Sequence, residues 1–259
     1  MDYLSVAKKA VLLAGRIHRK YFRKKIPVET KGETYDLLTI VDKEAEKIMV
    51  NYIKKYFPQH NFLCEEYRYE EKSSDFVWVI DPLDGTTNFV CGLPIFCASI
   101  ALVHKKEIFV SAVYDMNRSE LFYAEKNKGA WLNGRRIHVN NVEELKKALL
   151  ITGFYYNRGK EMVEALEAIK RFNFAQVLGI RRLGAAALDL CYVACGRASG
   201  FWEFELSPWD YLGGKLIVEE AGGKVTGRYG EEIPLDKKYF IVASNGKIHE
   251  NMLKIINEI

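Results

Sequence analysis

Hydrophobic positions in the first third of the chain follow helical spacing twice before the spacing changes to that of a strand. Apolar side chains recur at every third or fourth position over 4–25, and the opposite face of this predicted helix is basic. A second pattern of the same kind predicts a helix over 39–57. Residues 76–80 are continuously apolar and predict a buried strand. The polar residues 26–36 predict a loop between the two helices.

The rest of the chain alternates shorter apolar runs with further helical patterns. Strands are predicted at 98–103, 108–114, 120–125, 149–153, 175–178 and 200–205. A hairpin over 129–134 is predicted to turn at Asn133-Gly134. Helices are predicted at 161–172, 185–196 and 210–221, and a last strand and helix complete the chain.

The polar and charged residues 140–147 separate two groups of these elements. We therefore expect a single catalytic unit with two lobes, approximately 1–143, which would hold the metal site, and 144–259, which would hold the substrate. Strands and helices do not alternate steadily, as they would in a doubly wound parallel sheet. This order favours a layered α+β architecture.

Composition narrows the class of protein without identifying a function. The chain has 259 residues, of which 49% are hydrophobic and 28% charged, and these fractions exclude a disordered or fibrous protein. A net charge of +4 is too small to indicate a dedicated nucleic-acid binder, and it is equally compatible with a protein that binds a small anionic substrate. Five cysteines without a CxxC pair predict reduced thiols, and no signal-peptide core is present, so we expect a cytoplasmic protein. The uncharged residues 85–104 predict a loop and a buried strand, not a membrane span.

The most informative stretch is Asp81-Pro-Leu-Asp84-Gly85-Thr86-Thr-Asn-Phe, which follows the predicted strand 76–80. Two carboxylates three residues apart flank a proline that restricts the turn, and Gly85 allows a ligand to approach the backbone closely. Oxygen ligands held rigidly in this way suit a hard divalent cation that shares its coordination shell with a phosphate. If a helix begins after Asp84, its first N–H groups are free to bind the same phosphate. For the Asp-Gly dipeptide alone, a simple capped turn is the alternative.

Three further acidic positions lie where predicted elements begin or end. Glu65-Glu66 ends a short apolar run, Asp42 lies near the start of the second helix, and Asp210 opens a later helix. Each position alone is more typical of a helix cap or a surface residue. Together they place carboxylates from both halves of the chain at element ends, as a phosphate site with several metal ions requires.

These motifs resemble those of the inositol monophosphatase family, one of the lithium-sensitive, Mg²⁺-dependent phosphatases, a group that also includes the fructose-1,6-bisphosphatases. The strongest matches are 81–89, followed by Gly92-Leu-Pro94, and Trp209-Asp-Tyr-Leu-Gly-Gly214, which continues to 219–223. Weaker matches lie at 39–42, 65–66, 182–189, 196–197 and Glu203, so the resemblance covers nearly the whole chain. The segment 181–210 looks most like the bacterial branch. The resemblance implies a layered αβαβα sandwich and a homodimer.

The resemblance also implies a site with two to three Mg²⁺ ions. Glu65, Asp81 and the Leu83 carbonyl would bind the first ion, and Asp81, Asp84 and Asp210 would bind the second. Glu65 would help to hold a looser third ion. Physical chemistry agrees with this arrangement, because a metal ion acidifies water and makes a His or Cys nucleophile unnecessary. The five histidines lie outside these motifs and are predicted to be structural or surface residues.

The remaining roles follow from the same resemblance. Asp42 and Thr86 would orient or deprotonate the attacking water, with Glu65 as a further catalytic residue. The N–H groups of Gly85 and Thr86 would hold the phosphate, and Lys31 would lie in a mobile loop, 26–36, that closes over the metals. The residues expected to bind substrate are Asp84, Gly85, Thr86, Gly184, Ala185, Glu203 and Asp210, of which Gly184, Ala185 and Glu203 would face the alcohol.

We therefore predict a Mg²⁺-dependent phosphomonoesterase that hydrolyses inositol monophosphate. Fructose-1,6-bisphosphate, NADP or another small phosphate ester is an alternative substrate, because the motifs determine the reaction better than they determine the leaving alcohol. A second alternative is a regulatory protein that binds RNA or the transcription machinery. The basic face of residues 16–25 and the Arg181-Arg182 pair motivate it.

Overall fold

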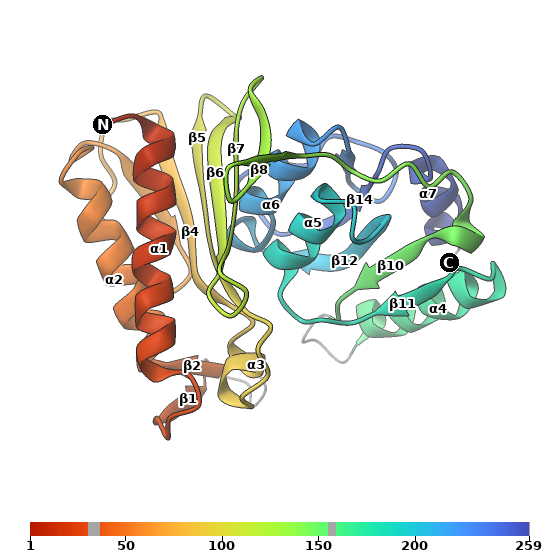
Figure 1. Ribbon diagram of the computed structural model, residues 1–259, viewed down its shortest axis with the longest axis horizontal. Coiled ribbons are helices and arrows are strands. Elements are labelled where there is room, and N and C mark those ends of the chain that lie inside the picture. Colours follow the sequence, from red (N-terminus) through yellow and green to blue (C-terminus); the bar gives the residue numbers. More distant parts are fainter. Residues whose placement is uncertain (31–36, 155–158, 259) are drawn as a thin grey trace.

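Helices and sheets alternate in five layers (Figure 1), in a computed structural model that describes residues 1–30, 37–154 and 159–258. Helices α1 (Tyr3–Tyr21) and α2 (Ile40–Lys54) cover one face of a seven-stranded sheet. Helices α5 (Ala186–Ala194) and α6 (Pro208–Glu220) lie between this sheet and a five-stranded sheet. On the far side of the second sheet lie α4 (Lys160–Phe174) and α7 (His249–Asn257). The predicted αβαβα sandwich is confirmed.

The seven-stranded sheet runs in sequence order, so each strand lies beside its neighbour in the chain. Its strands are β3 (Asn61–Cys64), β4 (Phe76–Asp84), β5 (Cys97–His104), β6 (Glu107–Asp115), β7 (Glu120–Glu125), β8 (Gly129–Leu132) and β9 (Arg135–Ile137). Only the β3–β4 pair is parallel, and the other pairs are antiparallel. Because β3 and β4 are parallel and Cys64 pairs with Ile80, the next residue of each segment, Glu65 and Asp81, lies at the same edge of the pair.

The five-stranded sheet has the order β11-β10-β12-β14-β13. Its strands are β10 (Leu149–Thr152), β11 (Gly179–Arg181), β12 (Gly200–Leu206), β13 (Lys224–Thr226) and β14 (Tyr239–Ser244). Strand β10 is parallel to both of its neighbours, whereas β14 is antiparallel to β12 and β13. The central strand β12 leads directly to α6, and this connection carries Asp210.

Four shorter elements complete the described residues. Strands β1 (Val28–Thr30) and β2 (Leu37–Thr39) form a small antiparallel pair, and a 3₁₀ helix, η1 (Leu145–Lys147), precedes the second sheet. Helix α3 (Thr86–Val90) follows β4. Strand β1 was not predicted, because it is short and polar. Lys31 and the rest of the predicted mobile loop up to residue 36 lie outside the described residues.

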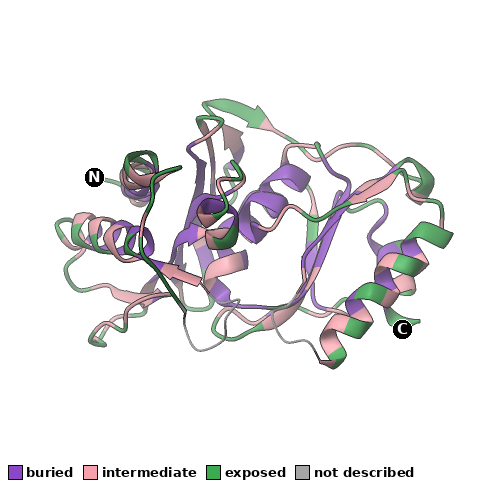
Figure 2. Cartoon of the chain, turned by 90° about the horizontal axis from the view of Figure 1, so that it is seen from below, coloured by how far each residue is buried: buried purple, intermediate pink, exposed green. Residues whose placement is uncertain are grey.

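Apolar side chains form three buried clusters between the layers, and buried residues line the facing sides of the sheets and helices (Figure 2). The first lies between α1, α2 and the seven-stranded sheet and contains the fully buried Trp78. The largest surrounds α5, whose nine residues are all buried, as the continuous hydrophobicity of the predicted helix 185–196 implies. The third contains Phe172 and Trp202, between the second sheet and its outer helices. Among the helices of the described residues, none combines the length and apolar character needed to cross a membrane.

Three predicted element bounds are corrected by the structure. The predicted strand 175–178 is wrong: these residues form the turn after α4, where Gln176 adopts a left-handed φ of 56°, and the strand follows at β11. Helix α1 ends at Tyr21 and not at residue 25, since Arg23 also adopts a left-handed φ, of 60°. Strand β4 continues past residue 80 to Asp84, with an irregular register against β5 between Asp81 and Asp84.

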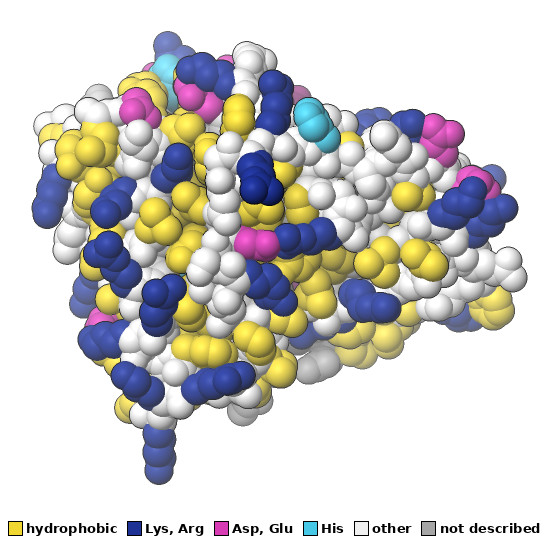
Figure 3. Space-filling model, in the orientation of Figure 1, with side chains coloured by type: hydrophobic (Ala, Val, Ile, Leu, Met, Phe, Trp, Pro, Cys, Tyr) yellow, Lys and Arg dark blue, Asp and Glu magenta, His cyan; other side chains and the backbone are white. Residues whose placement is uncertain are grey.

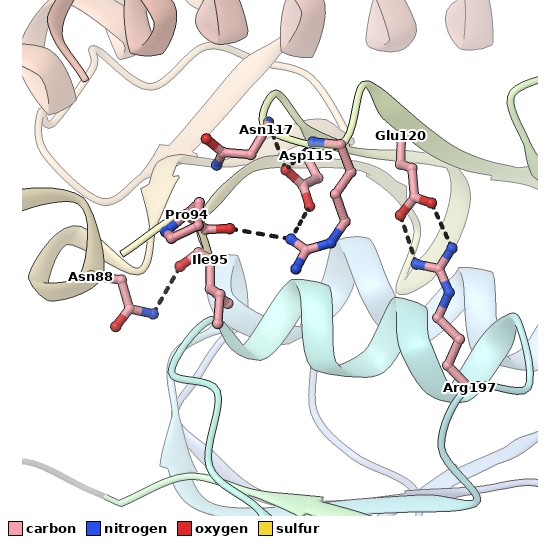
Figure 4. Close-up of polar contacts among 8 residues, drawn as sticks. Asn88, Pro94, Ile95, Asp115, Asn117, Glu120 and Arg197 are labelled. Carbon is pink, nitrogen blue, oxygen red and sulfur yellow. Dashed lines mark hydrogen bonds and ion pairs between the residues drawn. The ribbon is translucent and has the colours of Figure 1, made fainter. Parts of the chain in front are cut away.

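Polar contacts fix the middle helices against the first sheet (Figure 4). Just after α5, Arg197 donates to both carboxylate oxygens of Glu120 at the start of β7. Within the first sheet and its loops, Arg118 donates to Asp115 and to the Pro94 carbonyl oxygen.

The seven-stranded sheet takes its strands from residues 61–137 and the five-stranded sheet from residues 149–244, so the predicted lobe boundary near 143 falls between them. The division into a metal lobe and a substrate lobe stays a prediction.

Candidate active site

A cavity of about 370 Å³ lies where the end of β4, the start of α3, the end of β12 and the start of α6 meet. Charged side chains dominate its lining. Those of the acidic residues are Glu65, Asp81, Asp84, Glu203, Glu205 and Asp210, and those of the basic residues are Arg182 and Lys238. Residues that are more than a hundred positions apart in the chain therefore face one space, and the predicted acidic residues from both halves are brought together.

The turn after β4 presents its backbone to this cavity. The Leu83 N–H donates to Asp81 Oδ1 at 2.9 Å, which keeps the turn tight around the buried Asp81. Gly85 caps α3 with a φ of 93°, and a Cβ there would stand 3.0 Å from the Ile95 carbonyl oxygen. Both constraints require glycine at this position. Because α3 begins at Thr86, the N–H groups of Gly85 and Thr86 precede any helical hydrogen bond and are available to a ligand.

Two of the predicted acidic residues occupy equivalent positions in their helices. Asp42 is the third residue of α2, and its Oδ2 accepts hydrogen bonds from the N–H and hydroxyl of Thr39, at 2.7 and 2.6 Å. Asp210 is the third residue of α6, and its Oδ2 accepts from the Ser207 N–H at 2.7 Å. Each capping box therefore fixes one carboxylate oxygen and leaves Oδ1 for the site.

The Thr86 hydroxyl connects Asp42 to the turn of β4. Its Oγ1 lies 3.0 Å from Asp42 Oδ1 and also 3.0 Å from the Leu83 carbonyl oxygen. A hydroxyl has one hydrogen, so it donates to only one of these acceptors at a time. When it donates to Asp42, the Leu83 carbonyl is left for another ligand. Burial raises the pKa of Asp42, which makes this carboxylate a better proton acceptor.

Repulsion adds to burial in setting the charge of the site. Burial first, and then the neighbouring Glu65, Asp84 and Asp210, raise the pKa of Asp81 well above its ordinary value. Burial also raises the pKa of Asp84 to about 7, although the Ala187 N–H donates to its Oδ2 at 2.8 Å. The strongest charges acting on Asp81 are all carboxylates, so the site calls for a positively charged ligand.

The donor set suits a hard cation such as Mg²⁺, because it consists of carboxylate oxygens and one backbone carbonyl. Within the ranges that the structure describes, no group of three or more His, Cys, Asp or Glu side chains is arranged to hold a metal ion by itself. The predicted set of Asp81, Asp84 and Asp210 is therefore open and not closed around one point. Magnesium keeps several waters and shares its shell with phosphate, so an open set completed by water and substrate fits it.

Glu203 lines the same cavity, as do Gly184 and Ala186. Its carboxylate occupies the space beside the buried Gly153, where a Cβ would stand 2.0 Å from the carboxylate atoms. Burial raises the pKa of Glu203 to about 8, and the charge of Arg182 opposes this increase. Ala185 differs from the prediction, since its side chain is fully buried behind Gly85 and Ala186 lines the cavity instead.

Three supporting residues were missed by sequence reasoning. Glu46 accepts hydrogen bonds from the N–H groups of Glu66 and Tyr67 and so holds the segment that carries Glu65. Asn88 donates from Nδ2 to the carbonyl oxygens of Ile95 (Figure 4) and Leu183, each at 2.8 Å, which ties α3 to the wall of the cavity. His18 Nε2 donates to the Pro82 carbonyl oxygen, also at 2.8 Å. Glu46 and His18 could have been found from the sequence, because each is a charged or polar residue on the apolar face of its predicted helix.

Comparison with known proteins agrees with this geometry. The chain matches the model of the inositol monophosphatase family over residues 2–259. A protein named "Putative Nus factor SuhB" from Neisseria meningitidis serogroup B is 42% identical over 98% of each chain. An "Inositol monophosphatase 3" from Solanum lycopersicum is 41% identical over 99% of this chain and 97% of the relative. A "Fructose-1,6-bisphosphatase/inositol-1-monophosphatase" from Thermotoga maritima is 38% identical over 100% and 97%.

Solved structures support the same fold. An IMPase from Thermotoga maritima superimposes with a TM-score of 0.91 and is 36% identical, covering 100% of this chain and 98% of that one. An IMPase/NADP phosphatase complexed with Mg²⁺ and phosphate superimposes with a TM-score of 0.80 at 29% identity, covering 91% and 87%. A protein of similar fold therefore binds both the cation and the anion that the cavity suits.

Proposed function

Because the chain belongs to the inositol monophosphatase family, we propose that it is a Mg²⁺-dependent phosphomonoesterase that hydrolyses inositol monophosphate. One observation carries the reaction: Glu65, Asp81, Asp84 and Asp210 line one cavity with the Leu83 carbonyl. Thr86, hydrogen-bonded to Asp42, lies at the edge of the same group. Carboxylates gathered in this way would bind Mg²⁺, and the bound cations together with the helix N–H groups would suit a phosphate ester.

The acidic wall would hold the cations, and each of its residues has a separate task. Glu65, Asp81 and the Leu83 carbonyl would hold one Mg²⁺, Asp81, Asp84 and Asp210 a second, and Glu65 would help with a third. When bound, Mg²⁺ supplies positive charge to the phosphoryl oxygens and lowers the pKa of the attacking water. The N–H groups of Gly85 and Thr86 would orient the phosphate at the start of α3.

Asp42 and Thr86 would act on the attacking water. The Thr86 hydroxyl already donates to Asp42 Oδ1, so a lone pair of Oγ1 can accept a hydrogen bond from water. As the water attacks, its proton would move to Thr86 Oγ1 while the Thr86 proton moves to Asp42. The hydrogen bonds from Thr39 to Oδ2 hold the carboxylate in place during this transfer.

The alcohol part of the substrate would lie against Gly184 and Glu203. A carboxylate accepts hydrogen bonds from hydroxyl groups and repels phosphate, so Glu203 suits a polyol and not the phosphoryl group. Inositol monophosphate therefore fits this wall better than a bisphosphate such as fructose 1,6-bisphosphate does.

Phosphate release tests the proposal. The purified protein would be assayed on inositol 1-phosphate, fructose 1,6-bisphosphate, NADP and glycerol 2-phosphate, with Mg²⁺ and with EDTA. We expect hydrolysis that EDTA abolishes and Mg²⁺ restores, with inositol 1-phosphate preferred. We also expect inhibition by Li⁺, as an inference from the family. Full activity in EDTA would contradict the metal-dependent reaction, and a preference for another ester would contradict only the substrate.

A second candidate function is contact with RNA or the transcription machinery. Lys and Arg side chains are spread over the face of the molecule seen in Figure 3, on which α1 lies. The exposed residues of α1 include Arg16, Arg19 and Lys20. A close relative is named as a putative Nus factor. Gel-shift and pull-down experiments at physiological salt would test this function, and charge reversal on α1 should abolish any binding found.

Oligomeric state and location are also proposals. We propose a homodimer, in line with the family resemblance, which sedimentation or light scattering would test. A cytoplasmic location is supported by the five cysteines, Cys64, Cys91, Cys97, Cys191 and Cys195, which all carry free thiols.

A further inference from the structure

A β-bulge lies in β12 immediately before the cavity. The pairing of β12 with β14 matches Glu203 to Ile241 and Leu206 to Tyr239, so β12 has one more residue than its partner in this interval. Glu205, inside the bulge, adopts a left-handed φ of 51°. A side chain with a Cβ is strained in this conformation, which glycine adopts freely. Strain of this kind, held beside a candidate active site, calls for a functional explanation.

The bulge changes which side chains reach the cavity. In a regular strand, alternate residues face the same side, so Glu205 would line the cavity and Leu206 would not. Here the successive residues Glu205 and Leu206 both line it, together with Glu203. Phe204 faces the other way, where its ring meets that of Phe240 at 4.4 Å. The bulge therefore adds Leu206 to the cavity wall while the Glu205 carboxylate stays in it with that of Glu203.

These two carboxylates are available to a ligand, unlike the cations near them. Among the described residues, neither Glu203 nor Glu205 has a side-chain hydrogen bond or ion pair. The nearest opposing charge on Glu203 is that of Arg182, whose guanidinium lies 5.9 Å from the centre of the Phe154 ring. Lys238 also lines the cavity but already has an interaction of its own. The wall therefore offers up to four carboxylate oxygens to hydrogen-bond donors.

We propose that Glu205 determines substrate specificity: with Glu203 it accepts hydrogen bonds from the hydroxyl groups of a neutral polyol, and its charge repels an alcohol that carries a second phosphate. The inference rests on the proposed phosphatase reaction and narrows its substrate class to phosphate monoesters of uncharged polyols. Repulsion of the wrong substrate is a common source of specificity, because it costs the correct substrate nothing.

Two variants separate the charge of Glu205 from its backbone strain. Glu205→Gln keeps the side-chain length and the strain but removes the charge, whereas Glu205→Gly removes charge, side chain and strain. Gln176→Gly is the matched control, since Gln176 is exposed, has a left-handed φ of 56° and lies after α4, outside the cavity. Each protein would be assayed with Mg²⁺ on inositol 1-phosphate, fructose 1,6-bisphosphate and glycerol 2-phosphate.

We expect the ratio of kcat/KM for fructose 1,6-bisphosphate to that for inositol 1-phosphate to rise about tenfold in both Glu205 variants. Once the carboxylate is removed, the charge of Arg182 in the lining is no longer opposed by that of Glu205 and attracts the second phosphate. Gln176→Gly should leave the ratio unchanged. If both Glu205 variants retain the wild-type ratio while the enzyme hydrolyses its esters normally, this inference is overturned and the proposed function stands. If the wild-type protein hydrolyses none of the esters with Mg²⁺, the proposed function fails and this inference fails with it.

Discussion

At the scale of single residues, the Thr86 hydroxyl separates catalysis from substrate recognition. It lies 3.0 Å from Asp42 Oδ1, and we propose that it acts on the attacking water and not on the alcohol. We expect Thr86→Ala to lower kcat about 10²-fold on inositol 1-phosphate and on glycerol 2-phosphate alike, because a proton acceptor for the attacking water is lost. Thr87→Ala is the control, since Thr87 is the exposed next residue of α3 and does not line the cavity. A loss confined to one substrate would show that Thr86 serves recognition instead.

Gly153 tests the position of the Glu203 carboxylate. A Cβ at residue 153 would stand 2.0 Å from the Glu203 carboxylate atoms, so Gly153→Ala must displace them. We expect about a tenfold loss of kcat/KM for inositol 1-phosphate and a smaller loss for glycerol 2-phosphate, which has fewer hydroxyl groups to bind. Gly179→Ala is the control in the same sheet, because its nearest neighbour is the flexible end of the Arg181 side chain. Equal losses on both esters would assign Glu203 to the metals or the fold.

Where a motif was local, the sequence indicated which residues would lie together. The stretch from Asp81 to Thr86 forms one turn at the cavity, whereas the roles of its residues rest on the family resemblance and stay predictions. The left-handed backbone of Glu205 and the inward position of Leu206 could not be found from a local motif, because both depend on a bulge that the pairing of β12 with β14 creates. The side chain of Ala185 was misplaced by one position for a similar reason, since the start of α5 decides which of two adjacent alanines faces the cavity.

At the scale of elements, the start of α6 combines a helix cap with a metal-ligand position. The Ser207 N–H donates to Asp210 Oδ2, and asparagine could accept the same hydrogen bond through its side-chain oxygen. We therefore expect Asp210→Asn to lower kcat by at least ~10²-fold while the protein remains folded. Asp2→Asn is the control, because Asp2 is the N-cap of α1, accepts a helix-end hydrogen bond from the Ser5 N–H and does not line the cavity. Near-normal turnover of Asp210→Asn, measured at saturating Mg²⁺, would exclude Asp210 as a ligand.

Elements with a strong hydrophobic period were predicted closely, and those that depend on tertiary pairing were not. Helix α2 differs from its prediction by only a few residues at each end, because Thr39 caps its start and an apolar stripe fixes its length. Strand β1 and strand β11 have three residues each and hold their place through partners elsewhere in the chain. A three-residue strand carries too short a pattern to be distinguished from a turn.

At the scale of the whole molecule, the acidic cavity should make stability depend on pH and on Mg²⁺ together. Burial raises the pKa of Asp84 to about 7 and that of Glu203 to about 8, both above the values of an unfolded chain. Between the pKa of each carboxyl group in the unfolded chain and its higher pKa in the folded protein, the folded protein binds more protons. The free energy of unfolding therefore falls as pH rises through this range. His18 and His249 act in the opposite sense, since burial lowers each pKa to about 4, but they do so only below about pH 6.5. The carboxylates therefore dominate between pH 6.5 and 8.

In EDTA, we expect the free energy of unfolding to fall by roughly 1–2 kcal/mol between pH 6.5 and 8, after allowance for partial solvent screening. This corresponds to a decrease in Tm of about 2–6 °C. Saturating Mg²⁺ binds the ionised carboxylates, so the increase in Tm that it causes should be larger at pH 8 than at pH 6.5. Glu203→Gln should make the decrease in EDTA shallower, because it removes one of the groups that must ionise. Thermal unfolding followed by circular dichroism would measure each of these changes in Tm. A Tm in EDTA that rises from pH 6.5 to 8 would contradict the burial of ionisable acids in one cavity, and with it the electrostatic basis of the proposed metal site.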